Sequence, residues 1–151
     1  MAKSYAQTVT YEQKCKIIGD DDIVQMSLIQ DGQTLIHRVT AYEEENCQKQ
    51  YLIFDRVYLL EKTNDSALFL IHQKALYTPL TQEVAKALNL INYCGYRSWL
   101  NGQSKDVTGQ KCDDFQQLAN QQKVVIPGQM TAESIYFDLP ADPVPYQLKR
   151  L

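Results

Sequence analysis

Cysteine is the residue type with the widest chemistry in this chain, because a thiolate can bind a metal, attack a substrate or form a disulfide. Four cysteines stand far apart along the 151 residues, namely Cys15, Cys47, Cys94 and Cys112. None lies in a CxxC or CxH arrangement, the short spacing that lets two soft ligands reach one zinc ion. The spacing therefore predicts no metal site, and no motif in the chain calls for a cofactor.

An even number of cysteines favours disulfides, and four cysteines allow three pairings. We favour the sequential pairing, Cys15 with Cys47 and Cys94 with Cys112, because it closes the shortest loops. On the loop-entropy model each bridge stabilises the fold by about 3 kcal/mol. The alternative is four unpaired, buried thiols in a cytosolic protein.

Acid–base chemistry rests on two histidines, His37 and His72. Both fall in strand-like segments, where histidine is usually a hydrogen-bonded packing residue. If these segments were neighbours in one sheet, the two rings would approach each other, with Asp55 or a cysteine nearby. No hydrolase elbow, metalloprotease helix or nucleotide-binding loop accompanies them, and disulfide pairing would remove every cysteine nucleophile. We expect no catalytic residue, with an enzyme using His37 or His72 as an alternative.

A recognition surface is the other candidate, in the glycine-punctuated segment between Cys94 and Cys112. Its "YRSW" stretch holds Tyr96, Arg97 and Trp99, residue types that supply much of the binding energy at protein interfaces. A bridge between the two cysteines would constrain this otherwise irregular loop. The alternative is that Trp99 folds back over the sheet edge and anchors the loop.

The elements that would position these residues begin with strands. From Tyr5 to Ile17 the residues alternate in polarity, which predicts a half-buried strand. Two further strand-like runs, 23–30 and 33–42, flank Asp31-Gly32, a pair typical of a type I′ hairpin turn that would set Leu28 opposite Leu35. Residues 51–61 and 67–77 predict a second hairpin, whose apolar content is too continuous to identify the buried face.

A helix is predicted next, with Thr78 as its N-cap, Pro79 at its first position and its end near Asn92. Residues 113–122 are compatible with a short helix, 123–127 with a short strand, and 130–139 with a final strand. The proline-rich end, 140–151, predicts an extended tail outside a single globular domain at 1–139.

Composition excludes several classes of protein. The net charge of -3 and the scattered basic residues argue against a nucleic-acid partner. No apolar run is long enough to span a membrane, and the first ten residues lack the apolar region of a signal peptide. Disulfides would nevertheless place the chain outside the cytoplasm, so we expect a periplasmic or secreted protein whose signal peptide is absent from this sequence.

The order of elements predicts an α+β fold. We expect a twisted antiparallel sheet of about five to seven strands, rich in hairpins, packed against one main helix that follows the fifth strand. The alternative is a small β-barrel with an appended helix.

For function, we expect a non-catalytic binding module that recognises a protein partner of the cell envelope or surface through the Cys94–Cys112 loop. Carriage of a small apolar ligand between sheet and helix is the alternative.

Overall fold

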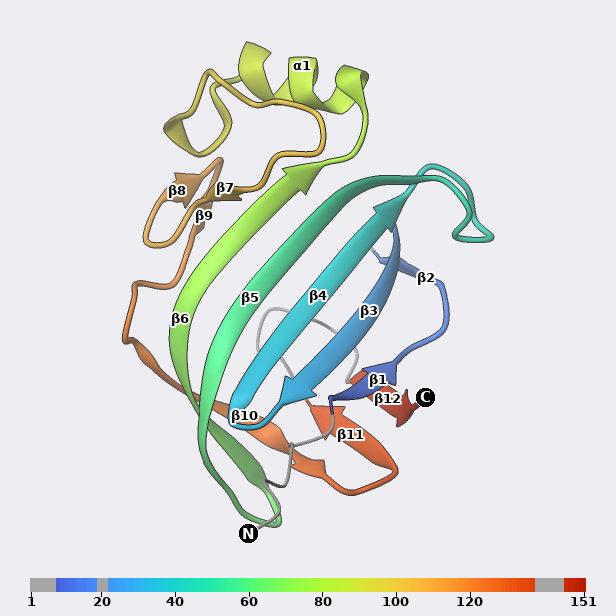
Figure 1. Cartoon of the computed structure of the whole chain (residues 1–151), viewed down its shortest axis with the longest axis vertical. Helices are drawn as coiled ribbons and strands as arrows, with labels where there is room; N and C mark the ends of the chain where they lie inside the picture. Colours follow the sequence, from blue (N-terminus) through green and yellow to red (C-terminus); the bar gives the residue numbers. More distant parts are fainter. Residues whose placement is uncertain (1–7, 19–21, 138–145) are drawn as a thin grey trace, which may run out of the picture.

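The chain folds into an antiparallel β-barrel with a helical insertion (Figure 1). The computed structural model describes residues 8–18, 22–137 and 146–151. Within these ranges eight strands follow one another round the barrel in chain order: β1 (Val9–Glu12), β3 (Asp22–Asp31), β4 (Thr34–Tyr42), β5 (Gln50–Thr63), β6 (Ala67–Pro79), β10 (Lys123–Met130), β11 (Ser134–Phe137) and β12 (Tyr146–Arg150). The barrel with an appended helix, the alternative architecture, is confirmed, and the open sheet is wrong.

The barrel is closed by its first and last strands along the chain, β1 and β12. β1 pairs with both β3 and β12, and β12 also pairs with β11. Residues 146–150 were expected in a tail, and that expectation is wrong because their partners are distant segments that local composition does not reveal. The rest of the predicted tail, 140–145, lies outside the described residues.

The first predicted strand is interrupted. β1 ends at Glu12, and Lys16–Ile18 form a separate strand, β2, at the edge of β3. The predicted start of that strand, Tyr5, lies outside the described residues. The chain between β1 and β2 holds Cys15, whose disulfide to Cys47 joins it to the loop between β4 and β5.

β3 and β4 form the predicted hairpin, but its turn lies one residue later than expected. The central residues are Gly32, with φ 61°, and Gln33. Glycine at the first central position fits a type II′ turn. Leu28 consequently lies opposite His37 and not opposite Leu35. The partner shifts by two residues, so the predicted buried face is unchanged.

The half of the barrel interior away from helix α1, drawn lower in Figure 1, is filled with side chains. Alternate residues of the strands point inward, and their buried members form one core: Tyr11, Met26, Leu28, Leu35, Tyr58, Leu68, Leu70, Ile126, Ile135 and Leu148. The cavity left among them is about 20 Å³, little more than a single water probe requires. We call this region the filled half.

The upper half of the barrel is open because the closing strands are short. β1 pairs with β3 only along residues 27–30 of β3, and β10 pairs with β6 only along residues 67–71. β3, β4, β5 and β6 continue beyond these pairings (Figure 1). Their inner face above the pairings is what we call the open half.

The insertion lies between β6 and β10. It contains helix α1 (Gln82–Leu90), the 3₁₀ turn η1 (Tyr93–Gly95) and three two-residue strands, β7 (Lys105–Asp106), β8 (Lys111–Cys112) and β9 (Phe115–Gln116). α1 follows β6, the fifth barrel strand along the chain, as expected. The short helix predicted over 113–122 is wrong, since β9 pairs with β8 there.

The helix begins later than its sequence predicts. Thr81 is the N-cap, and its hydroxyl accepts a hydrogen bond from the backbone N–H of Val84 at 3.2 Å. Thr78 and Pro79 instead end β6, where Thr78 is paired with Ile53 of β5. Strand pairing therefore overrides a local signal that suited either structure.

A second core joins the insertion to the open half. Its buried members come from β6 and the insertion: Ala75, Ala85, Leu88, Cys94, Trp99, Val107 and Cys112. The disulfide between Cys94 and Cys112 lies inside this core. The helix therefore packs beside one end of the barrel. The open-sheet prediction required the helix to cover a face of the sheet, and it does not do so.

All four cysteines are paired, Cys15 with Cys47 and Cys94 with Cys112. Two disulfides indicate an oxidising, extracytoplasmic compartment. In the part of the chain that the structure describes, no helix has the length and apolar character needed to cross a membrane.

Candidate functional site

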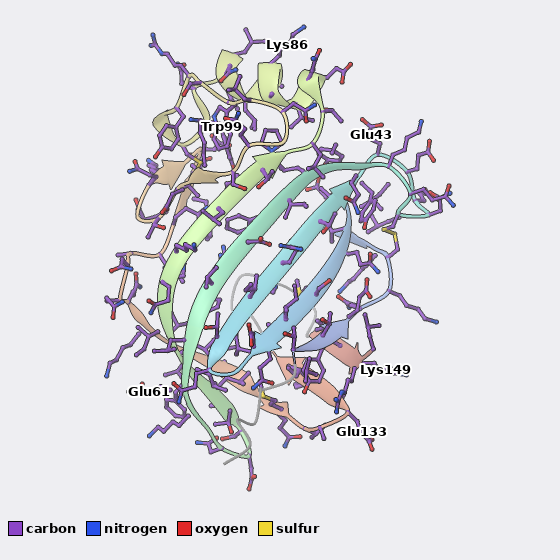
Figure 2. The ribbon with its side chains drawn as sticks, viewed as in Figure 1. Glu43, Glu61, Lys86, Trp99, Glu133 and Lys149 are labelled. Atoms are coloured by element: carbon purple, nitrogen blue, oxygen red, sulfur yellow. A yellow bond between two sulfur atoms is a disulfide. The ribbon has the colours of Figure 1, made fainter. Side chains whose placement is uncertain are left out.

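The candidate site is the mouth of the barrel, at the end that carries the insertion. Figure 2 marks this end by Glu43, Lys86 and Trp99, and the opposite end by Glu61 and Glu133. A cavity of about 250 Å³ opens here. Its apolar lining comes from four neighbouring strands: Val24 of β3, Val39 and Ala41 of β4, Leu52 and Phe54 of β5, and Tyr77 of β6.

The lining is ordered by strand register. Val39 lies opposite Phe54, which in turn lies opposite Tyr77, and Ala41 lies opposite Leu52 one row nearer the mouth. Because side chains alternate between the faces of a strand, these rows share the inner face. The strands thus gather apolar side chains from distant parts of the sequence on one concave surface.

An aromatic pair forms one wall of the cavity. The rings of Phe54 and Tyr77 are stacked, with centroids 4.3 Å apart and planes 19° from parallel. Behind them Tyr93 meets Tyr77 edge to face at 5.4 Å, and the two hydroxyl oxygens are 3.3 Å apart. Burial, and then the hydrogen bond with Tyr93, raise the pKa of Tyr77. The wall therefore presents neutral aromatic surface at any physiological pH.

The rim of the mouth is acidic. Asp22 and Tyr51 line the cavity at its outer edge, where Asp22 is exposed. The pKa of Tyr51 is raised by burial and then by the negative charges of Asp22 and Glu43. An entering molecule therefore passes carboxylates before it reaches the apolar lining.

A cation lies next to the cavity lining, one row further into the barrel. One row below Val39, Phe54 and Tyr77, the register places Arg56 of β5 on the same inner face. Its Cζ lies 4.8 Å from the ring centroid of Phe54 and 5.3 Å from that of Phe115 in the insertion. Arg56 is partly buried, between the filled and open halves.

Both histidines are buried, and both face the barrel interior near Arg56. Burial, followed by the charge of Arg56, lowers the pKa of His37 to about 3. Burial is also the main cause that lowers the pKa of His72, whose Nδ1–H donates to the carbonyl of Ala119 at 3.0 Å. The two imidazoles are therefore neutral at physiological pH, and both histidines lie in strands, as predicted, with His37 among apolar side chains.

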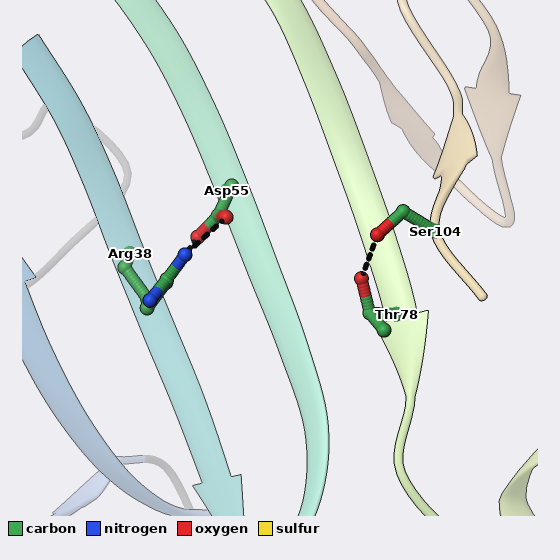
Figure 3. Close-up of polar contacts among 4 residues, drawn as sticks. All are labelled: Arg38, Asp55, Thr78 and Ser104. Carbon is green, nitrogen blue, oxygen red and sulfur yellow. Dashed lines mark hydrogen bonds and ion pairs between the residues drawn. The ribbon is translucent and has the colours of Figure 1, made fainter. Parts of the chain in front are cut away.

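The carboxylate proposed as a companion of the histidines lies elsewhere. Asp55 is on the outer face of β5 and forms a two-point ion pair with Arg38 of β4 (Figure 3). Nε donates to Oδ1 at 2.8 Å and Nη2 donates to Oδ2 at 2.9 Å. Because adjacent strand positions point to opposite faces, Asp55 is kept from the interior that Arg56 enters.

The predicted recognition residues of the loop have different environments. Trp99 is 1% exposed, its backbone N–H donates to Asn89 Oδ1 at 2.7 Å, and its indole N–H donates to the Tyr93 carbonyl at 3.2 Å. Tyr96 is partly buried and donates to the Asp106 carbonyl at 2.8 Å. Arg97 is exposed. Trp99 therefore anchors the loop, which is the alternative role expected for it.

The loop is also tied directly to the barrel. Thr78 of β6 and Ser104, which precedes β7, have hydroxyl oxygens 2.6 Å apart (Figure 3). β7 adds backbone pairing to β6, with Tyr77 opposite Lys105. The disulfide, Trp99 and these contacts together hold the insertion against the strand that carries Tyr77.

Sequence reasoning missed the residues of the mouth. Phe54, Arg56 and Tyr77 belong to continuous apolar runs, from which the inward-facing side chains could not be identified. Alternation along β5 would nevertheless have grouped Phe54 with Arg56 and Tyr58. Across residues 8–18, 22–137 and 146–151, no group of three or more His, Cys, Asp or Glu side chains could hold a metal ion. The chemistry available at the mouth is therefore apolar contact, aromatic contact, carboxylates at the rim and the partly buried positive charge of Arg56 next to the lining.

Comparison with known proteins adds no family to this description. The chain matches no protein-family model, and no curated protein is similar enough in sequence to be a recognisable relative. Function therefore has to be inferred from the site itself, since a barrel fold is compatible with many functions.

Proposed function

We propose that this protein is a non-catalytic binding protein of the periplasm or the extracellular space that holds a small, largely apolar ligand in the mouth of its barrel. The observation that carries the proposal is the cavity of about 250 Å³ lined by Val24, Val39, Ala41, Leu52, Phe54 and Tyr77. The cavity lies at the barrel mouth and not between sheet and helix, where the second core fills the space.

Physical reasons support a ligand at this place. Mouths of β-barrels are common ligand sites, because strands hold apolar side chains rigidly around a concave surface. Ligand sites are usually about 300–1,000 Å³, so this cavity suits a small molecule. An apolar concavity next to a filled core also leaves surface in water that a ligand would remove from it.

Filling the cavity tests the proposal. Native mass spectrometry of the purified protein should show a bound small molecule, or binding of an added apolar probe such as octan-1-ol. Val39→Phe should lower the affinity for that ligand at least about tenfold, because the new ring occupies its space. Val125→Phe is the matched control, since Val125 is 55% exposed on the outer face of β10.

Circular dichroism melting establishes that both variants fold, and Ala41→Phe provides a second cavity-filling variant. Equal affinities in Val39→Phe, Ala41→Phe and the control would exclude the mouth as the binding site.

Recognition of a protein partner of the cell envelope or surface by the insertion is a second candidate function. Four large apolar side chains in the described part of the insertion are exposed, and the three most exposed are Leu90 by 84%, Ile91 by 66% and Leu100 by 55%. The Asn89 amide bonds both to the backbone N–H and to the carbonyl of Trp99, so the segments that carry these side chains are adjacent. Exposed apolar groups of this kind mark protein contacts more often than isolated ones do.

Substitution of this surface separates the two candidates. Leu90→Ser with Leu100→Ser should abolish binding to an envelope protein without changing ligand affinity at the mouth. Ile17→Ser, at another exposed apolar position on β2, should leave both unchanged. A partner that binds the double variant as well as it binds the native chain would contradict recognition through the insertion.

A further inference from the structure

Arg56 differs from the other cations at this end of the barrel because it lies on the inner face. Its Nε is buried and has no hydrogen-bond partner among the residues that the structure describes. Its neighbours across the strands are His37 and Ala75, neither of which carries a negative charge there. In the described ranges no carboxylate forms an ion pair with Arg56.

The environment of the guanidinium compensates its charge only in part. The rings of Phe54 and Phe115 lie at cation–π distance, an interaction that favours the cation through the ring faces. The Tyr58 hydroxyl is also hydrogen-bonded to Arg56, and the charge of Arg56 and this hydrogen bond oppose the effect of burial, which raises the pKa of Tyr58. Ring faces do not accept the in-plane N–H donors of a guanidinium, of which there are five. This partly buried charge therefore has no anionic partner within residues 8–18, 22–137 and 146–151, although a cation removed from water normally has one.

The outer face of the same sheet shows the complete arrangement. Arg38 donates through Nε and Nη2 to both oxygens of Asp55, at 2.8 and 2.9 Å. Arg56 is one residue along β5 from that aspartate and points the other way. Among the residues that the structure describes, a carboxylate pairs with the arginine on the outer face and none pairs with the one on the inner face.

Position along the strands connects Arg56 to the cavity. Residues two apart on one face of a strand are about 6.8 Å apart, a distance that the long arginine side chain can span. Phe54 lines the cavity and is also the ring against which the guanidinium lies. A molecule seated between Val39, Phe54 and Tyr77 would meet the positive charge at its inner end.

We propose, resting on the proposed function of the mouth, that the natural ligand is a small amphipathic carboxylic acid whose carboxylate pairs with Arg56 and whose apolar part fills the cavity. A carboxylate matches the planar donor geometry of arginine. One negative charge suffices for one cation, and the acidic rim formed by Asp22 and Glu43 opposes ligands with further negative charge at the outer end. The cavity of about 250 Å³ limits the apolar part of the ligand to a small group.

The test compares two probes that differ only in their head group, octanoate and octan-1-ol, by isothermal titration calorimetry at pH 7.5. Octanoate should bind the native protein about 10 to 100 times more tightly than octan-1-ol, the gain typical of a charge-assisted hydrogen bond. Arg56→Gln should bind both probes with the affinity that octan-1-ol shows for the native protein. Arg38→Gln, on the outer face, should keep the full preference.

Folding of each variant is checked by circular dichroism melting, and Arg56→Lys supplies a second variant that keeps the charge. A preference for octanoate that survives in Arg56→Lys and disappears in Arg56→Gln supports recognition of the anion. Equal binding of the two probes by the native protein overturns the inference and leaves the proposed function standing. If neither probe binds the native protein and no small molecule co-purifies, the proposed function fails too.

Discussion

The filled half and the open half of the barrel interior are built from the same strands, yet they differ in what occupies them. In the filled half, side chains from every barrel strand meet and leave a cavity of about 20 Å³. In the open half, the residues that line the cavity come from β3, β4, β5 and β6, and the cavity is about 250 Å³. Where the ring of strands is complete it forms a core, and where β3, β4, β5 and β6 extend beyond that ring they leave a cavity, so the proposed function would separate stability from binding along the same strands.

Truncating a leucine in each half should give the largest contrast. Leu35→Ala removes a side chain that is 1% exposed in the filled half, and it should lower the free energy of unfolding by about 2–5 kcal/mol. Leu52→Ala removes a partly exposed side chain at the mouth and should cost less than half as much. Urea denaturation measures both, and equal losses would show that the mouth is part of the structural core.

Removing each disulfide should separate its effects on stability and on binding. Cys94→Ala with Cys112→Ala should lower the free energy of unfolding by about 3 kcal/mol and weaken ligand binding, because the insertion supports the Tyr77 wall. Cys15→Ala with Cys47→Ala should cost a similar amount and leave affinity nearly unchanged. Unfolding and calorimetric titration test this. Equal effects of the two double variants on affinity would contradict a role of the insertion in the site.

Acid should destabilise the interior through its histidines. Their pKa values are lowered in the folded chain, so the unfolded chain binds more protons below pH 6.5 and the free energy of unfolding falls as pH drops. The loss is about 1.4 kcal/mol per pH unit for each histidine that stays neutral. Melting between pH 7.5 and 5.5, above most carboxylate titration, measures it. A double variant, His37→Leu with His72→Leu, should lose this slope, and a retained slope would assign it to other groups.

The two arginines provide the smallest and most specific contrast. Arg56→Met removes a partly buried charge that has no ion-pair partner among the described residues, so the free energy of unfolding of the ligand-free protein should not fall and should rise by up to about 1 kcal/mol. Arg38→Met breaks a partly exposed ion pair and should lower it by up to about 1 kcal/mol. Thermal unfolding compares them. A clear loss of stability in Arg56→Met would mean that the surrounding rings already compensate the charge.

Local patterns explain which parts of the fold the sequence could predict. Alternating polarity and turn residues identified both hairpins, and the spacing of the cysteines favoured the pairing that the structure contains. The helix was expected three residues early because Thr78 and Thr81 are equally good caps until β5 pairs with Thr78. Trp99 illustrates a further limit, since its residue type suits an interface and an anchor alike, and only its hydrogen bonds to Asn89 and Tyr93 distinguish them.

The sequence by itself determined the elements that depend on residues close to one another in the chain. These are the strands of the two hairpins, a helix after them and an even set of cysteines suited to oxidation. Each follows from side-chain periodicity, turn preference or spacing, which act within a few residues. The tertiary structure alone decided that β12 closes the barrel, that the upper strands extend beyond its ring, and that Arg56 faces inward while Asp55 faces out. These features arise from pairing between segments far apart in the chain, and such pairing is set by the combined burial of all the strands, which no single stretch of sequence contains.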